Sequence, residues 1–511
     1  MKSLFKTVAL VTIFSAITRV LGFLFRIYLS RALSAEELGL YQVALSVFMV
    51  LLTVVSSGLP VVISKLTAKY HAEKDKTSEG KLVSTSLIIS LITSLILIMF
   101  VLIFKGVFTS LFADERCFTI LLILLPAVLF AGVYSVFRGA MWGHTNYFSF
   151  CITELVEQVV RIVLCVFMIT FSFFSLTPMV NAGLSLTIAS LLSAVLAMIL
   201  YFTSGGKLKR PSGVYKEVIK STSGVTGVRV ASSLAQPIIA LILPARLIAS
   251  GYTNSQALSL YGVAMGMTVP LLFIPITLVG SLSMVLIPDL SAAVANEDKD
   301  YVKNRINSSI IFTLLITFLL IPLYVGAGDY IGLFFFDNLQ SGQLLASSAW
   351  VMLPFALLNI TSAILNALGQ EVKSFINYLI GSIFLFIGII FLPSFVGIRA
   401  LPFAMGTCVF VASLLNLRMI NKKLGIKISI FGHILKLSLI SFPAMAITYF
   451  LANVLSNFIP LFFNLAISCS VGGIMFVLLC IIFKICNVQA LYFEFKNKFK
   501  TKVKVKKRKK A

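Results

Sequence analysis

The chain has 511 residues, of which 59% are hydrophobic and 12% charged, and its mean hydropathy is +1.03. Soluble domains contain about 25% charged residues, so this composition excludes an ordinary soluble enzyme or binding module. The tail "KFKTKVKVKKRKKA" holds a large share of the net charge of +24. Because this tail directly follows a hydrophobic segment, we expect it to bind anionic membrane lipids and not nucleic acid.

Apolar runs of about twenty residues recur along the chain and predict an all-α polytopic membrane protein with about fourteen transmembrane helices. The predicted spans are residues 7–29, 39–62, 82–104, 117–137, 151–173, 178–203, 221–249, 256–287, 308–328, 345–366, 374–394, 397–417, 433–455 and 458–484. An even number of spans places both termini on one side of the membrane.

Basic residues indicate which side that is. Most lysines and arginines fall in the loops on the side of the termini, whereas the opposite loops hold Arg31, Lys105, Arg116 and Arg399. Cytoplasmic loops carry the excess of positive charge in membrane proteins. The sequence therefore predicts a multi-pass protein of the cell (cytoplasmic) membrane with both termini in the cytoplasm.

Five arginines lie inside predicted spans, and four of them are candidate substrate-binding residues. Arg19 and Arg26 are two helical turns apart and share one face of the first span, and Arg229 and Arg246 lie in the seventh. A charged side chain at the bilayer centre costs several kcal/mol (about 2.5–3.5 on insertion scales). We expect these arginines to line a wet cavity and bind an anion, because a guanidinium can donate two parallel hydrogen bonds to a phosphate. Alternatively, they reach the headgroups as topology anchors.

The fifth span, "TELVEQVVRI", places three charged residues on one helical face: Glu154, Glu157 and Arg161. Glu157 precedes Arg161 by four residues, which is the favourable order for an ion pair. Self-neutralisation within the bundle is one interpretation. The alternative is a carboxylate that couples transport to a cation or proton, with Glu154 the better candidate because its own segment offers it no partner.

An internal repeat is visible. "LGLYQVA" at 38–44 recurs as "LSLYGVA" at 258–264, and Pro126 in the fourth span corresponds to Pro354 in the tenth. This indicates two parallel six-helix lobes plus two extra C-terminal helices, with a binding site between the lobes as in transporters of this type. The predicted domains are 1–220 (first lobe), 221–420 (second lobe), 421–490 (extra helices) and 491–511 (basic tail).

Enzymatic motifs are missing from the sequence. It contains no G-x-x-x-x-G-K-[ST], G-x-S-x-G or H-E-x-x-H pattern, so neither an ATPase nor another enzyme is predicted. The seven cysteines form no C-x-x-C pair and the three histidines are scattered near loops, so we expect no cofactor and no metal site. Pro237, Pro244, Pro270 and Pro275 are expected to kink or break the seventh and eighth spans.

Two stretches carry a family resemblance. "RVLGFLFRIYLSRALSAEELGLYQ" followed by "GLPVVISKLTAKY", and "RGAMWGHTNYFSFCITELVEQVVRI", resemble the stage V sporulation protein B family. These are polysaccharide-biosynthesis flippases of the multidrug/oligosaccharidyl-lipid/polysaccharide exporter superfamily. The resemblance implies a fourteen-helix flippase that moves an undecaprenyl-diphosphate-linked saccharide, such as a peptidoglycan precursor, for cell-wall or spore-cortex synthesis.

The resemblance also suggests residue roles. It implies that Arg19 faces a cationic cavity, whereas Arg26 lies one residue later than the family's corresponding arginine. It implies a groove for the lipid tail in 433–484, and cell-wall synthesis proteins as partners. Two other functions stay open: a cation-coupled drug or metabolite antiporter of the same fold, and a membrane glycosyltransferase or polymerase. Mid-span arginine favours anionic cargo over a cationic drug, and the short outer loops argue against an enzyme.

Overall fold

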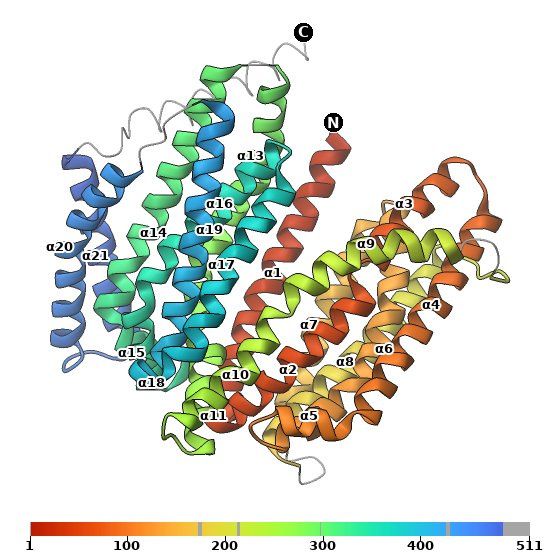
Figure 1. Cartoon of the computed structure of the whole chain (residues 1–511), viewed down its shortest axis with the longest axis horizontal. Helices are drawn as coiled ribbons and strands as arrows, with labels where there is room; N and C mark the ends of the chain where they lie inside the picture. Colours follow the sequence, from red (N-terminus) through yellow and green to blue (C-terminus); the bar gives the residue numbers. More distant parts are fainter. Residues whose placement is uncertain (1, 172–175, 212–214, 297, 426–429, 484–511) are drawn as a thin grey trace. The chain divides into compact units, whose positions relative to one another are not determined.

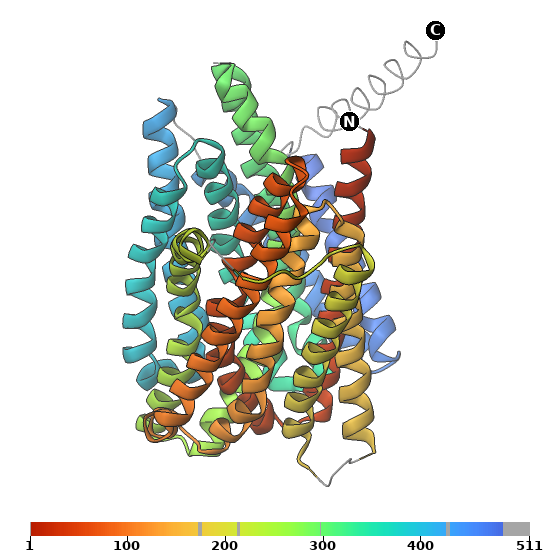
Figure 2. The ribbon, with the colours of Figure 1, turned by 90° about the vertical axis from the view of Figure 1, so that its right-hand side faces the viewer.

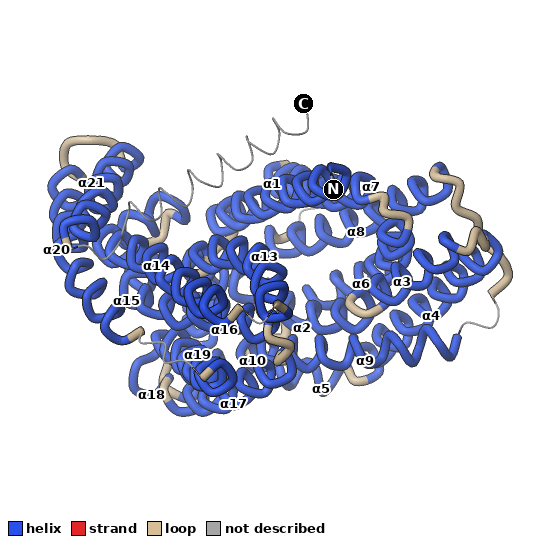
Figure 3. The backbone as a smooth tube through the Cα atoms, turned by 90° about the horizontal axis from the view of Figure 1, so that it is seen from above, coloured by secondary structure: helices blue, strands red, loops and turns tan. Residues whose placement is uncertain are grey.

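The structure is a computed structural model that describes residues 2–171, 176–211, 215–296, 298–425 and 430–483. All regular secondary structure in these residues is helical (Figure 3). Twelve helices are long and apolar enough to cross a membrane, or thirteen if a bent pair is counted as one span. The prediction of an all-α polytopic membrane protein is confirmed. The basic tail lies outside the described residues.

The chain forms two compact units, Met1–Met267 with Ile389–Ile398, and Thr268–Gly388 with Arg399–Ala511. The helices of the first unit are α1 (Lys2–Ala32), α2 (Ala35–Ser56), α3 (Leu59–Ala72), α4 (Lys76–Ile103), α5 (Lys105–Leu111), α6 (Arg116–Gly143), α7 (Tyr147–Thr170), α8 (Pro178–Thr203), α9 (Tyr215–Ser233), α10 (Ala235–Ala249), α11 (Asn254–Gly262) and α18 (Pro393–Val396). The segment 221–262, expected in the second lobe, groups with this unit, and the lobe boundary stays a prediction.

The second unit contains the remaining helices. They are α12 (Val269–Leu272), α13 (Ile274–Ala295), α14 (Lys299–Phe336), α15 (Leu339–Ser348), α16 (Met352–Ala367), α17 (Glu371–Phe391, whose last residues group with the first unit), α19 (Ala400–Leu424), α20 (Phe431–Leu455) and α21 (Leu461–Ile482). Short 3₁₀ turns cover Ala349–Val351 and Gly397–Arg399, and a π-helix covers Val263–Thr268.

Helix α7 differs from the twelve candidate spans. It is 24 residues long, but it contains Glu154, Glu157 and Arg161. It is therefore not among the twelve helices that are apolar enough to cross a membrane. It nevertheless packs on α8 and α1 inside the first unit. Helices α2, α3, α4, α6, α7 and α8 lie side by side there as a bundle (Figures 1 and 2).

The two copies of the repeated motif begin with the same local structure. The Ser34 side chain caps α2 and Glu37 bonds back to the cap, and Thr253 and Gln256 do the same for α11. Each capping box satisfies two backbone N–H groups that have no partner inside the helix. Both motifs thus open a helix, as expected.

Helices α2 and α11 pack against each other through glycine. A Cβ at Gly39 would overlap the carbonyl oxygen of Leu258, and one at Gly262 would overlap that of Ala35. Only glycine permits so close an approach of two backbones. The two copies of the motif therefore form one contact inside the first unit.

Helix breaks or bends lie next to three of the four predicted prolines, whereas Pro244 lies inside α10, which continues through it. A break at Leu234 separates α9 from α10, just before Pro237. The chain bends by 41° between Asn254–Leu272 and Ile274–Ser283, next to Pro275. The π-helix lies immediately before α12, which contains Pro270. Proline removes a backbone donor and its ring clashes with the preceding turn, which explains the break near Pro237 and the bend near Pro275.

Candidate functional site

Helix α1 carries two of the predicted anion-binding residues, Arg19 and Arg26, and both are exposed. The helix packs mainly on α7, where Phe14 and Phe148 meet edge to face with ring centroids 6.3 Å apart. Among the described residues, neither guanidinium has a hydrogen-bond partner or a carboxylate within 4 Å. Their donors are free to bind an anion.

Arg161 of α7 adds a third positive charge near α1. Its guanidinium lies over the ring of Phe25, 5.2 Å from the centroid, and within electrostatic range of Arg26. It donates to the side-chain oxygen of Gln158, and its Nε is buried without a partner. Two like charges in an apolar setting repel each other strongly, so an anion next to Arg26 and Arg161 would stabilise both.

The expected Glu157–Arg161 ion pair is not formed. Within the described chain the two groups interact electrostatically but lie beyond ion-pair distance, and Glu157 lies near Ser193 of α8. The reason is geometric. Gln158 lies one turn before Arg161, and the guanidinium donates a hydrogen bond to its side-chain oxygen instead of pairing with Glu157.

Glu154 has a partner that its own segment does not show. Arg138 of α6 lies 3.7 Å from it, and both side chains are about one-third exposed, at 29% and 32%. The Arg138 guanidinium also lies over the rings of Trp142 and Phe150, 4.5 and 5.0 Å from their centroids. Glu154 has no ion-pair partner within its own segment, as expected, and its partner comes from another helix.

Arg229 and Arg246 are held differently from the arginines of α1. Arg229 of α9 donates to the carbonyl of Ser57, at 3.0 Å, and Ser57 is the C-terminal cap of α2. Arg246 of α10 donates from Nε to the carbonyl of Ile390, at 2.7 Å, in the last turn of α17. The carbonyls at a helix C-terminus lack intrahelical partners and attract cations. Each arginine therefore stabilises a helix end with one of its N–H donors. The other N–H groups of its guanidinium stay available for further hydrogen bonds.

A polar network near the start of α2 was not predicted. Arg116 of α6 binds Glu36 and also Asp114, at 2.9 Å, while Ser255 donates to Glu36 and Asn254 donates to Asp114 at 3.3 Å. The hydrogen bond from Arg116 holds the pKa of Asp114 below its usual value. This network joins α2, α6 and α11, which are too distant in sequence for spacing to connect them.

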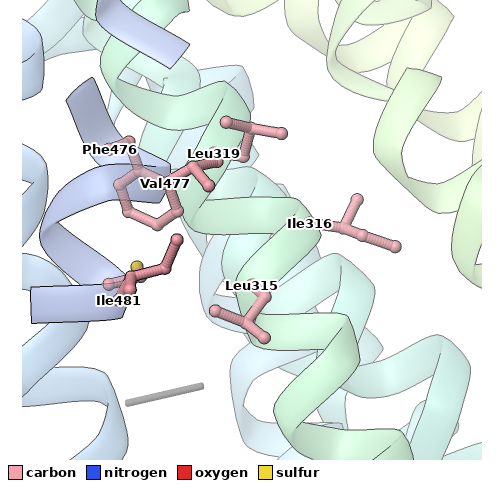
Figure 4. A pocket seen from close by; sticks show the side chains of 7 residues that line it. Leu315, Ile316, Leu319, Phe476, Val477 and Ile481 are labelled. Atoms are coloured by element: carbon pink, nitrogen blue, oxygen red, sulfur yellow. The ribbon is translucent and has the colours of Figure 1, made fainter. Parts of the chain in front are cut away.

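The second unit contains an apolar pocket of about 200 Å³ between α14 and α21 (Figure 4). Its lining is almost wholly hydrocarbon, and Figure 4 shows Leu315 and Leu319 of α14 facing Phe476 and Ile481 of α21. Ile316, Val477 and Cys480 complete it. The lining residues offer no charged group, so the pocket suits an apolar ligand.

Comparison with known proteins identifies the family. Residues 4–294, more than half of the chain, match the model of the polysaccharide biosynthesis protein family. The chain belongs to this family. It is a multi-pass membrane transporter of the multidrug/oligosaccharidyl-lipid/polysaccharide superfamily, as the resemblance indicated.

Relatives of this polysaccharide biosynthesis protein align with most of its length. It is 27% identical to stage V sporulation protein B of Bacillus subtilis (strain 168) over 93% of this chain and 94% of that protein. It is 22% identical to the lipid II flippase MurJ of the same organism, over 72% and 74%. A solved structure of lipid II flippase MurJ, in an inward closed conformation, is similar with a TM-score of 0.74 and 17% identity, over 93% and 98%. The fold is that of MurJ.

Proposed function

We propose that this protein is a flippase that moves an undecaprenyl-diphosphate-linked saccharide, such as a peptidoglycan precursor, across the cytoplasmic membrane for cell-wall or spore-cortex synthesis. The observation that carries the proposal is the pair of unpartnered arginines on α1, Arg19 and Arg26, of which Arg26 lies near Arg161. Membership of the polysaccharide biosynthesis family and likeness to stage V sporulation protein B and a lipid II flippase support it.

Electrostatics favours an anionic headgroup as the ligand. Keeping a guanidinium in the membrane without a counter-ion costs several kcal/mol, so a sequence that retains Arg19, Arg26 and Arg161 together needs a compensating interaction. A diphosphate offers several oxygens to the planar donors of arginine. In the proposed mechanism these three residues bind the diphosphate, and Arg229 and Arg246 contribute the N–H groups that the helix ends leave unused.

The pocket between α14 and α21 is the proposed location of the lipid tail. Its apolar lining complements a prenyl chain, and it adjoins the two C-terminal helices to which the family resemblance assigns a tail groove. Headgroup and tail would then be bound by different kinds of surface. The headgroup would meet arginine donors, and the tail would meet leucine, isoleucine and phenylalanine.

The proposed architecture is fourteen helices in two parallel six-helix lobes, with α20 and α21 outside the repeat. The helices that are long and apolar enough to cross a membrane number thirteen when the bent pair is counted as one span. Adding α7 to these thirteen supports the number fourteen. The paired capping boxes of α2 and α11 support the repeat. The lysine and arginine distribution supports cytoplasmic termini, with the basic tail on anionic lipid.

A cation-coupled antiporter of the same fold is the second candidate. The observation that favours it is the pair of half-buried carboxylates on α7, Glu154 and Glu157, of which Glu157 has no cation within 4 Å among the described residues. These carboxylates could instead couple flipping to a cation gradient. The two candidates differ in the charge of the cargo, because the flippase moves an anionic headgroup and the antiporter moves a cationic drug or metabolite.

A reconstituted assay tests the flippase. Vesicles with purified protein and a fluorescent undecaprenyl-diphosphate saccharide are treated with an impermeant quencher, and the fraction quenched over time reports crossing. We expect crossing with the wild type and at least about a tenfold loss with Arg19→Ala, since a charged hydrogen bond contributes about 1.5–3 kcal/mol. The exposed Lys105→Ala is the matched control. No crossing above empty vesicles, together with gradient-driven uptake of a cationic dye, would favour the antiporter.

A further inference from the structure

Three side chains that are distant in sequence meet at one end of the first unit. They are His71 in the last turn of α3, Glu79 in the first turns of α4 and His144 at the C-terminal cap of α6. One ligand atom from each lies within 4.8 Å of the other two. His144 Nε2 is 2.5 Å from Glu79 Oε1, and the two imidazole rings meet edge to face with centroids 4.8 Å apart.

The packing of α3 on α6 brings the histidines together. Gly139 faces Pro60 and Ile63, and one turn later Gly143 lies against Thr67, so closely that neither glycine could carry a side chain without displacing its neighbours. A histidine follows this contact on each helix. His71 lies one turn after Thr67 on α3, and His144 comes directly after Gly143 on α6. The close approach at the glycines thus places the two imidazoles side by side.

A tight helical hairpin supplies the carboxylate. Lys74 adopts a left-handed conformation with φ of 57°, and Asp75 caps α4 by accepting from the N–H groups of Thr77 and Ser78. This turn places Glu79 against the end of α6, where it is buried with 6% of its surface exposed. A buried carboxylate needs a cationic partner to offset its desolvation.

We propose that His71, Glu79 and His144 form a binding site for a divalent transition metal of the Zn²⁺ class. Two imidazole nitrogens and one carboxylate oxygen are a ligand set that zinc uses in proteins, with the fourth position left to water. Mg²⁺ and Ca²⁺ prefer oxygen ligands and would bind poorly here. The site is independent of the proposed lipid cargo.

The observed geometry needs only a small adjustment to hold the ion. Zinc–ligand bonds of about 2.0–2.2 Å place ligand atoms about 3–3.5 Å apart. The carboxylate and His144 would separate slightly, and the exposed His71 would rotate inward. The ion would link the ends of α3, α4 and α6 above a core that includes Ile63, Leu82 and Phe137, a structural role for the first unit.

The competing explanation is a simple ion pair between Glu79 and a protonated His144. The position of His71 distinguishes this explanation from a metal site. An ion pair has no use for a second imidazole, whereas a metal requires it. Nearby lysines oppose cation binding, since Lys69, Lys74, Lys76 and Lys81 are all within a few residues of the ligands. This repulsion is screened, because their side chains are long and reach solvent at the helix ends.

Metal titration of the purified, tag-free, full-length protein tests the site. After treatment with a chelator, Zn²⁺ is added and followed by calorimetry, and Co²⁺ is added and followed by its visible absorption. We expect one ion per chain, with about 100-fold or greater weakening in His71→Ala, His144→Ala and Glu79→Gln. His433→Ala, in the second unit, should bind like the wild type, and Mg²⁺ should not compete.

His71→Ala is the decisive variant, because its side chain is exposed and its loss leaves the core and the Glu79–His144 contact intact. Zn²⁺ should raise the melting temperature of the wild type and not that of this variant. Equal Zn²⁺ affinity in wild type and His71→Ala would overturn the proposal, as would the absence of Zn²⁺ binding to the folded wild type. Neither result bears on lipid flipping, which the vesicle assay measures separately.

Discussion

At the scale of single residues, the arginines of the first unit fall into two groups. Arg229 and Arg246 donate to carbonyls at helix ends, while Arg19 and Arg26 have no protein partner in the described part of the chain. The sequence predicted all four as substrate-binding residues and did not separate them in this way. Their difference depends on which carbonyls come close after folding, and periodicity along one helix carries no information about that.

The arginine–carbonyl contacts lead to a prediction. Arg229→Lys should keep most of the stability of the first unit, because an ammonium can also donate to the carbonyl of Ser57. Arg229→Leu should lower it by about 1–3 kcal/mol through loss of a charge-assisted bond to the cap of α2. Thermal unfolding of the two variants checks this. Equal melting temperatures would show that the contact does not contribute to stability.

Asp114 gives a pH prediction. Arg116 lowers the pKa of Asp114 in the folded protein, so the contribution of this carboxylate to stability is present above the usual Asp pKa of about 3.9 and is lost as pH falls through the lowered value. The difference in melting temperature between wild type and Asp114→Asn should therefore be constant above about pH 5 and shrink below pH 4. Because Arg116 is half exposed, at 49%, we expect at most about 1 kcal/mol. A difference that persists unchanged at low pH would contradict this assignment.

At the scale of helices, sequence reasoning succeeded where local chemistry decides. Apolar length located the helices, and prolines located the break near Pro237 and the bend near Pro275. It failed where partners come from other helices. Glu154 pairs with Arg138, and His71 meets His144, because α6 packs against α7 and α3. A single sequence without contact information cannot specify those neighbours.

The packing of α2 on α11 predicts a strong effect of one methyl group. Gly39→Ala places a Cβ on the carbonyl of Leu258 and should destabilise the first unit by about 1–3 kcal/mol, the usual cost of overpacking. Gly280→Ala is the control, since nothing lies within 4 Å of its Cβ, and should be neutral or slightly stabilising. Equal stability of the two variants in detergent would show that α2 and α11 do not approach as closely as described.

At the scale of the whole molecule, two chemically distinct surfaces define the account. The first unit contains the arginines of α1 and α7, and the second contains the apolar pocket between α14 and α21. In the proposed function, the first surface binds an anionic headgroup and the second an apolar tail. The repeat is a prediction from the sequence, which did not indicate that α9 to α11 group with the first unit, because contacts and not motif order determine that grouping.

Binding of a short-chain prenyl diphosphate is the most direct test of the central claim that unpartnered arginines hold an anionic headgroup. Its dissociation constant is measured for purified wild type, Arg19→Gln, Arg19→Lys and the control Lys105→Ala. The account predicts at least about tenfold weaker binding with Arg19→Gln, a smaller loss with Arg19→Lys because lysine lacks the planar fork, and no change in the control. Equal affinity of Arg19→Gln and wild type would contradict it.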